Sequence, residues 1–121
     1  MHLAQLATIA EYMSLEPDQR WGIPSVKSVK DRNLPHNLDL IIMPGVVFDT
    51  TMGRLGHGKG YYDKFMAKLE KEYSIYKINR PTIIALALRE QVLAGGSIPM
   101  LAHDFRPDYL VTPDTVYGRK I

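Results

Sequence analysis

The sequence predicts an α/β fold, a layered and mostly parallel sheet flanked by helices, in a single domain over residues 1–121. Short apolar runs bounded by proline, glycine or aspartate have the length and the β-branched content of buried strands. A segment with helical spacing of its apolar residues separates two of these runs, and strands that alternate with helices usually pair in parallel. The sequence shows no internal repeat, low-complexity tract or second domain.

The predicted strands lie in the middle and at the end of the chain. "LDLIIMP" (38–44) is an unbroken apolar run that ends at Pro44-Gly45, as a buried parallel strand does. The others are "VVFD" (46–49), "TIIALAL" (82–88) and "DYLVTPD" (108–114), which makes the last short strand. Between the last two, "REQVLAGG" (89–96) predicts a short helix or a turn that stops at Gly95-Gly96.

An amphipathic helix is predicted to begin near Tyr61. Apolar side chains recur at three- and four-residue intervals, and these are Tyr62, Phe65, Met66, Leu69 and Tyr73. Charged residues occupy the other faces, and each lysine of this segment has acidic neighbours. A solvated face is therefore expected here, and not a track for nucleic acid.

The first third of the chain carries weaker patterns. "MHLAQLATIAEYM" (1–13) has apolar residues at helical spacing, although a short strand at residues 3–6 before a helix fits nearly as well. The proline-rich, mixed-charge segment 16–37 predicts a surface connection with Trp21 as its one large packing anchor.

The composition excludes several classes of function. The formal charge of +2 is too small to indicate a nucleic-acid partner. The absence of cysteine excludes disulfides, thiolate nucleophiles and cysteine-bound zinc, and it fits a reducing compartment. The apolar runs are far shorter than the roughly 20 residues that span a bilayer, and no signal peptide is recognisable. We therefore expect a soluble, cytoplasmic protein without a membrane partner, with a mitochondrial location left open.

The segment "GRLGHGKGYYDKF" (53–65) is the main candidate for a functional site. It follows a predicted strand and opens the predicted helix, where free backbone N–H groups and the helix dipole favour an anion. Its four glycines let the backbone approach phosphate oxygens, and Arg54 and Lys59 add charged donors. The segment therefore predicts a phosphate site, with an ordinary flexible glycine turn as the alternative.

The common nucleotide-binding motifs do not account for this loop. Residues 53–59 satisfy the spacing G-x-x-x-x-G-K, but position 60 is glycine, where a P-loop needs the Ser or Thr that holds Mg²⁺. The dinucleotide pattern G-x-G-x-x-G fails as well, because Tyr61 stands where its third glycine belongs.

"DLIIMPGVVFD" followed by "GRLGHGKGYYD" resembles the signature of the 5-formyltetrahydrofolate cyclo-ligase family, whose members are also called methenyltetrahydrofolate synthetases. The resemblance extends to "RWGIP", "ALALREQ" and "IPMLAHDFRPDYLVTP" and so covers most of the chain. It implies an α/β enzyme that uses ATP and Mg²⁺ to convert 5-formyltetrahydrofolate to 5,10-methenyltetrahydrofolate, ADP and phosphate.

The resemblance also implies roles for individual residues. The implied ATP-binding residues are Arg54, Leu55, Gly56, His57, Gly58, Lys59, Gly60, Tyr61 and Tyr62. The implied folate-binding residues are Trp21, His57, Gly58, Lys59, Gly60 and Tyr61. Arg54, Lys59 and Tyr61 are the implied catalytic residues. From the residues alone, Tyr62 fits the apolar face of the helix equally well.

The implied magnesium ligands are Asp63 and Asp104, with Asp108 as the second choice. Sequence alone would make Asp63 a helix-start charge and Asp104 a turn residue. Carboxylates combined with phosphate oxygens are the ligands that Mg²⁺ prefers.

The implied reaction needs no protein nucleophile. The formyl oxygen attacks the γ-phosphate of ATP, N10 then attacks the activated carbon, and phosphate leaves as the ring closes. His57 departs from the arginine that the family often carries at this position.

The chain is also shorter than the family's members, and we expect it to lack their N-terminal elements. Exposed sheet edges would then permit self-association. A truncated, non-catalytic module that binds nucleotide or folate is one alternative to the enzyme. A nucleic-acid-binding domain that uses the lysines and tyrosines is another.

Overall fold

The computed structural model describes residues 3–26, 38–77, 79–102 and 104–118. The chain divides into two compact units, Met1–His36 and Asn37–Ile121, and each is described by itself. The single domain over residues 1–121 therefore stays a prediction. No helix in the described part of the chain is long and apolar enough to cross a membrane.

The described part of the first unit, residues 3–26, contains one short helix, α1 (Ile9–Met13). The helix begins at residue 9 because the side chain of Thr8 accepts a hydrogen bond from the backbone N–H of Glu11, which caps the first turn. Residues 3–8 form neither helix nor strand, so the strand alternative is wrong and the predicted helix is confirmed only over its last residues.

The connection after α1 is a turn held by Asp18. Its carboxylate accepts a hydrogen bond of 2.6 Å from the N–H of Trp21, and the turn is closed by an isolated bridge between Pro17 and Pro24. Trp21 is 68% exposed, and the guanidinium carbon of Arg20 lies 5.1 Å from the centroid of its ring. Within the first unit, Trp21 is therefore not the packing anchor that was expected. Residues 27–37 of the predicted connection lie outside the described residues.

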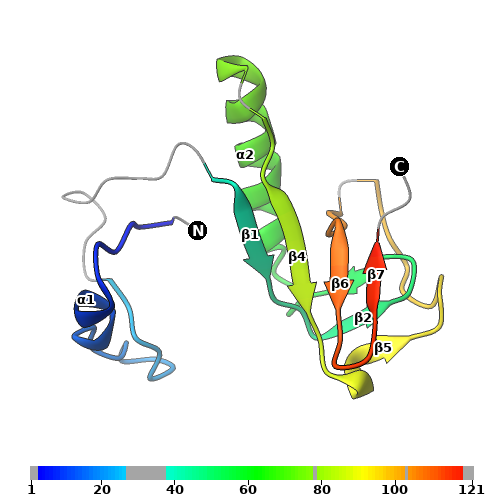
Figure 1. Ribbon diagram of the computed structural model, residues 1–121, viewed down its shortest axis with the longest axis horizontal. Coiled ribbons are helices and arrows are strands. Elements are labelled where there is room, and N and C mark those ends of the chain that lie inside the picture. The colour runs from blue at the N-terminus through cyan, green and yellow to red at the C-terminus, as the bar shows by residue number, and fades with distance from the viewer. Residues whose placement is uncertain (1–2, 27–37, 78, 103, 119–121) are drawn as a thin grey trace. The chain divides into compact units, whose positions relative to one another are not determined.

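The second unit is built on a four-stranded main sheet (Figure 1). Its strands, in spatial order, are β1 (Leu40–Met43), β4 (Thr82–Leu86), β6 (Tyr109–Val111) and β7 (Val116–Gly118). The first three pair in parallel, and β7 returns as an antiparallel hairpin partner of β6. The predicted mostly parallel sheet is confirmed, whereas β7 was not predicted.

A second, smaller sheet lies in the same unit. Its order is β3 (Arg54–Leu55), β2 (Val47–Asp49) and β5 (Val92–Leu93). The predicted short helix after β4 corresponds to a single turn of 3₁₀-helix, Arg89–Gln91, and β5 follows it directly. The predicted strand "VVFD" is confirmed as β2, but it belongs to this sheet and not to the main one.

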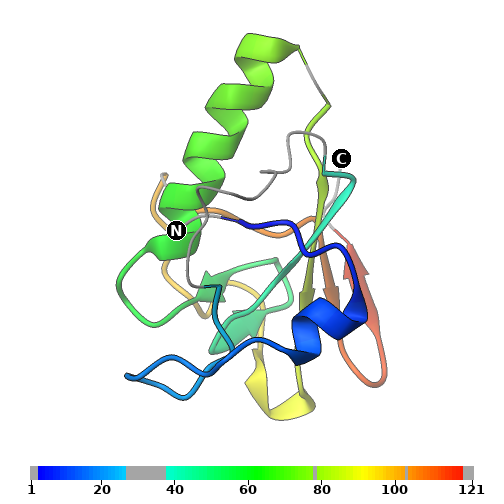
Figure 2. The ribbon, with the colours of Figure 1, turned by 90° about the vertical axis from the view of Figure 1, so that its left-hand side faces the viewer.

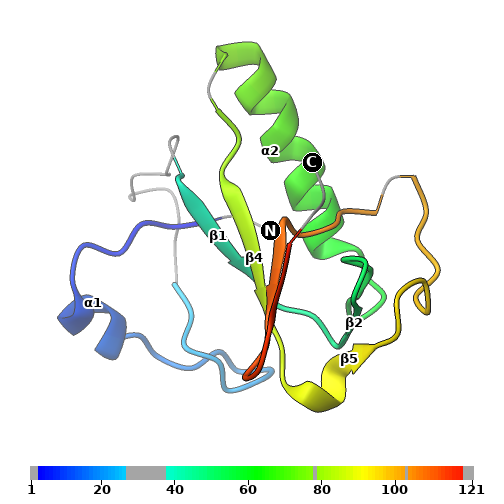
Figure 3. The same cartoon turned by 45° about the vertical axis from the view of Figure 1, so that its right-hand side comes forward.

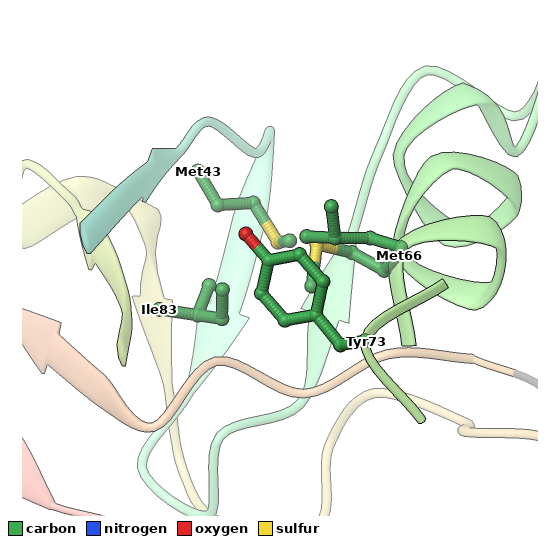
Figure 4. Close-up of a cluster of buried hydrophobic side chains, with 5 residues drawn as sticks. Met43, Met66, Tyr73 and Ile83 are labelled. Atoms are coloured by element: carbon green, nitrogen blue, oxygen red, sulfur yellow. The ribbon is translucent and has the colours of Figure 1, made fainter. Parts of the chain in front are cut away.

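The long helix α2 (Tyr61–Tyr76) begins where the sequence predicted and packs on one side of the main sheet (Figures 2 and 3). Its apolar stripe contributes Met66, Leu69 and Tyr73 to a buried cluster. Figure 4 shows Met66 and Tyr73 pointing toward Met43 of β1 and Ile83 of β4. The predicted apolar face of the helix is thus confirmed.

The two faces of the main sheet differ in burial. The covered face carries Met43, Ile83, Ala85 and Leu110, which pack on α2 or on the small sheet. The opposite face exposes apolar side chains, and these include Leu40, Ile42, Leu86, Tyr109 and Val116. The prediction of a fully buried first strand is wrong, because β1 is an edge strand whose alternate residues face outward.

Candidate functional site

The glycine loop, residues 53–60, joins the small sheet to the start of α2. Gly60 is the N-cap residue of α2, with φ of 66°, and Gly58 has φ of 88°. Both lie in the left-handed region that side chains disfavour, so the path of this loop requires glycine at these two positions. Because the cap residue is glycine, no side chain of its own bonds to the backbone N–H groups at the helix start, and this suits the binding of an anion.

Four side chains of the loop region are open to solvent. Leu55, His57 and Lys59 are exposed, and Tyr61 is 56% exposed at the first position of α2. The ammonium group of Lys59 and the phenol of Tyr61 can therefore meet a ligand without rearrangement of the chain. Tyr62 is instead half-buried and packs against the cluster under α2.

Arg54 is the buried cation of the site. Its side chain is 5% exposed, and its Nε donates a hydrogen bond of 2.8 Å to the carbonyl oxygen of Pro44. The guanidinium carbon lies 5.3 Å from the centroid of the Tyr62 ring, and Nη1 lies 4.0 Å from Oδ1 of Asp63. Arg54 therefore braces the end of β1, the glycine loop and the first turn of α2.

Arg54 stays charged although its surroundings lower its pKa overall. Burial lowers the pKa of Arg54, while the neighbouring Asp63 and Tyr62 raise it. Because an arginine starts from so high a pKa, it remains a cation at neutral pH. The predicted contact of Arg54 with phosphate stays a prediction, and the structure adds a bracing role that the sequence did not indicate.

The structure joins the segments that carry the two predicted magnesium ligands. Oδ1 of Asp63 accepts a hydrogen bond of 2.8 Å from the backbone N–H of Phe105, the residue after Asp104. Oδ2 of Asp104 accepts one of 2.9 Å from Leu101 N–H. Two carboxylates on adjoining segments fit the oxygen chemistry of Mg²⁺. The part of the chain that the structure describes holds no cluster of three or more His, Asp or Glu residues, so water or phosphate oxygens would complete the shell.

Asp108 has a structural role at the start of two strands. Its Oδ2 accepts a hydrogen bond of 2.8 Å from Ile83 N–H, and Oδ1 accepts one of 2.6 Å from Arg80. These contacts tie the beginning of β6 to the beginning of β4. Trp21, the remaining predicted folate contact, belongs to the first unit, and its contact with substrate stays a prediction.

Sequence reasoning missed Asp49, the last residue of β2. Its side chain is almost fully buried and accepts hydrogen bonds from Thr51, Gly53 and Ile98. Burial would raise the pKa of Asp49, but these hydrogen bonds outweigh it and lower the pKa below the ordinary value of 3.8. The available signal was an aspartate directly followed by two threonines at the end of an apolar run, which is typical of an Asx turn.

Comparisons with known proteins match this arrangement to one family. A family model, described as the 5-formyltetrahydrofolate cyclo-ligase family, matches residues 3–113. The chain belongs to this family. The cyclo-ligase resemblance seen in the loop and its flanking strands is thereby confirmed across nearly the whole sequence.

Individual cyclo-ligase relatives agree with this. The chain is 36% identical over 119 residues to a probable 5-formyltetrahydrofolate cyclo-ligase of Schizosaccharomyces pombe, covering 95% of this chain and 58% of that protein. It is 34% identical over 111 residues to the 5-formyltetrahydrofolate cyclo-ligase of Mus musculus, covering 89% of this chain and 52% of that protein. The chain therefore spans little more than half the length of these relatives.

A solved structure supports the fold of the cyclo-ligase unit. The NMR structure of Aquifex aeolicus 5,10-methenyltetrahydrofolate synthetase is similar with a TM-score of 0.61 and 30% identity. The match covers 89% of this chain and 49% of that chain. The predicted α/β fold is confirmed by this likeness.

Proposed function

We propose that the chain catalyses the ATP- and Mg²⁺-dependent conversion of 5-formyltetrahydrofolate to 5,10-methenyltetrahydrofolate, with release of ADP and phosphate. The observation that carries the proposal is the glycine loop at the start of α2, with Lys59 exposed on it and Asp63 bonded to the segment that carries Asp104. Membership of the cyclo-ligase family directs this phosphate-binding chemistry toward a formylated folate.

The reaction proceeds by transfer of a phosphoryl group to the substrate. The formyl oxygen on N5 attacks the γ-phosphorus as the bond to ADP breaks, which turns a poor leaving oxygen into a good one. N10 then attacks the formyl carbon, loses its proton, and phosphate departs as the five-membered ring closes. Phosphoryl transfer needs alignment and charge stabilisation from the protein more than covalent chemistry.

The residues of the loop have distinct tasks in this proposal. Lys59 and the backbone N–H groups of the loop bind the phosphate oxygens. Arg54 adds a buried positive charge and holds the loop in shape through its hydrogen bond to the Pro44 carbonyl. The exposed ring of Tyr61 stacks on the flat pterin of the folate. His57, which is exposed on the same loop, contacts ATP and the folate.

Asp63 and Asp104 would hold the magnesium ion. When bound, Mg²⁺ neutralises charge on the phosphates. Asp63 lies 4.0 Å from the Arg54 guanidinium and keeps one oxygen on Phe105 N–H, so a bound cation must share this carboxylate with its two existing partners. The ion would then rest on two carboxylates and on the nucleotide itself.

The test is to mix the purified chain with 5-formyltetrahydrofolate, ATP and Mg²⁺ and to follow the near-ultraviolet absorbance of the methenyl product. Parallel samples omit ATP or contain EDTA, and circular dichroism establishes that the chain is folded. We expect product only in the complete mixture. A folded chain that binds ATP without forming product would reject catalysis by these 121 residues.

That second outcome would support a non-catalytic module that binds nucleotide or folate. The specific observation in its favour is the coverage of the relatives, since only about half of their length is matched by this chain. Equilibrium dialysis against ATP and against 5-formyltetrahydrofolate separates this module from a chain with neither activity. A cytoplasmic location remains a prediction.

We also propose that the chain self-associates through the open face and edge of its main sheet. The strand positions on this face contain no charged residue, so two copies can stack without like-charge repulsion. Parallel sheets are nearly always covered on both faces, and β1 is also a free edge in the described unit. The occupant that we propose for this face is a second copy of the chain.

Sedimentation velocity over a range of concentrations tests this association. We expect the wild type to form a species heavier than the monomer and the variant Ile42→Lys to remain monomeric. Ile75→Lys is the matched control, because Ile75 is similarly exposed, at 65% against 58%, but lies on α2. Equal behaviour of the two variants would argue against association through the sheet face.

A further inference from the structure

Residues 96–102 and 104–106 belong to a segment that lies against both the turn after β2 and the start of α2. Five hydrogen bonds attach it. They are Gly96 N to Thr51 Oγ1 at 3.3 Å, Ile98 N to Asp49 Oδ2 at 3.1 Å, Arg54 N to Met100 Sδ at 3.5 Å, Phe105 N to Asp63 Oδ1 at 2.8 Å and Arg106 Nη1 to Thr51 O at 2.8 Å. The segment is therefore fixed near both of its ends.

Asp49 is the group that links this segment to the turn. Its Oδ1 accepts from Thr51 N at 3.0 Å, from Thr51 Oγ1 at 2.7 Å and from Gly53 N at 2.9 Å, while its Oδ2 accepts from Ile98 N. Asp49 is 1% exposed, so its carboxylate is shielded from solvent. One buried carboxylate thus shapes the turn with one oxygen and holds the segment with the other.

The position of Asp104 depends on these attachments. Asp104 lies between Ile98, which Asp49 holds, and Phe105, which Asp63 holds. A tight turn sets its side chain, because Asp104 N donates to Leu101 O at 3.1 Å and Leu101 N donates to Asp104 Oδ2. The attachment at Ile98 is the bond that ties this segment to the buried carboxylate of Asp49, and its loss would loosen the part of the segment before Asp104, although the bonds at Gly96, Met100 and Arg106 remain.

We propose that Asp49 is a positioning residue for the divalent-cation site, which it serves by holding this segment at Ile98 so that Asp104 stays beside Asp63. The inference rests on the proposed function, since it assumes that Asp63 and Asp104 share a cation with bound ATP. It adds a residue that touches neither the nucleotide nor the cation.

The test is the gain in ATP affinity that Mg²⁺ provides, measured by equilibrium dialysis in EDTA and in excess Mg²⁺. Asp49→Asn keeps the size of the side chain, but its amide NH₂ cannot accept a hydrogen bond and must face one set of N–H donors. We expect the variant to bind ATP in EDTA within about 2-fold of wild type and to lose most of the Mg²⁺-dependent gain. Mn²⁺ binding to the ATP complex, followed by electron paramagnetic resonance, should weaken in parallel.

Two further variants separate positioning from loss of stability. Asp104→Asn should remove the same Mg²⁺-dependent gain in ATP affinity. The double variant Asp49→Asn/Asp104→Asn should lose no more of this gain than Asp104→Asn alone, because both substitutions act through the carboxylate of Asp104. Tyr73→Phe keeps the ring in the core but removes the hydrogen bond that Leu38 N donates to the Tyr73 hydroxyl, so it lowers stability near the C-terminal end of α2 and should keep the gain. If Asp49→Asn does not fold, Thr51→Val is the alternative. It removes the hydrogen bond that the Thr51 hydroxyl donates to Asp49 Oδ1 and the one that it accepts from Gly96 N, and it should cause a smaller loss of the Mg²⁺-dependent gain.

The outcomes distinguish this inference from the proposed function. A wild type whose ATP affinity does not respond to Mg²⁺ contradicts the magnesium requirement itself, and the positioning role falls with it. A wild type that gains affinity while Asp49→Asn gains equally overturns the positioning role alone. Additive losses in the double variant overturn it as well, because they would mean that Asp49 acts elsewhere than through Asp104.

Discussion

Replacing Gly53 with alanine is expected to lower the free energy of unfolding by about 3 to 5 kcal/mol, because the turn cannot accommodate a methyl group. A Cβ atom at this position would lie 2.4 Å from Oδ2 and 2.8 Å from Cγ of Asp49. The buried carboxylate would have to move and would give up hydrogen bonds to Thr51, Ile98 and Gly53 itself. Each such bond to a charged group is worth about 1.5 to 3 kcal/mol.

Urea denaturation of the wild type and of two alanine variants measures this effect. Gly58→Ala is the matched control, because nothing lies within 4 Å of a Cβ there and its only cost is the positive φ. That strain amounts to about 1 to 2 kcal/mol. Equal losses for the two variants would mean that Asp49 can rearrange freely and that the packing of this turn contributes little to stability.

The longer elements of the fold were predictable because their patterns extend over several periods. The apolar stripe of α2 covers about three helical turns, and the strands β1 and β4 are four and five residues long. The strands β3, β5 and β7 have only two or three residues each. So short a strand shows no period of its own, and its conformation comes from pairing with a neighbour. The three-residue strands β2 and β6 were predictable because each coincides with an uninterrupted apolar run, residues 46–48 and 109–111, between turn-forming residues.

The sequence could not indicate which face of the main sheet is covered. Ile42 and Met43 are adjacent apolar residues of one run, yet Met43 is fully buried and Ile42 is 58% exposed. An apolar run predicts that a strand joins a sheet, whereas the burial of each face depends on which elements pack there. In the second unit both α2 and the small sheet pack on the same face.

The candidate site was predictable in its location more than in its internal order. Arg54 and Lys59 are both cations of one glycine-rich segment, and nothing local distinguishes them. The structure separates them, because pairing of β3 with β2 turns Arg54 toward Pro44 and Asp63 while Lys59 stays exposed. Such contacts join residues that are distant in the sequence, as does the bond from Ile98 to Asp49, so they become visible only in the folded chain.

Lys59→Ala is expected to weaken ATP binding by about 30- to 150-fold, which corresponds to about 2 to 3 kcal/mol for the loss of a charged hydrogen bond to phosphate. Lys59 is exposed on the glycine loop, so its removal should leave the fold intact and the free energy of unfolding nearly unchanged. Lys68→Ala is the matched control, since Lys68 is an equally exposed lysine further along α2. Equilibrium dialysis of ATP measures both affinities even if the chain forms no product.

A loss of similar size in the two variants would indicate diffuse attraction by net positive charge, and higher salt should then abolish binding altogether. A loss confined to Lys59→Ala would instead assign the phosphate contact to the loop, because only that lysine lies between the left-handed glycines that open the helix.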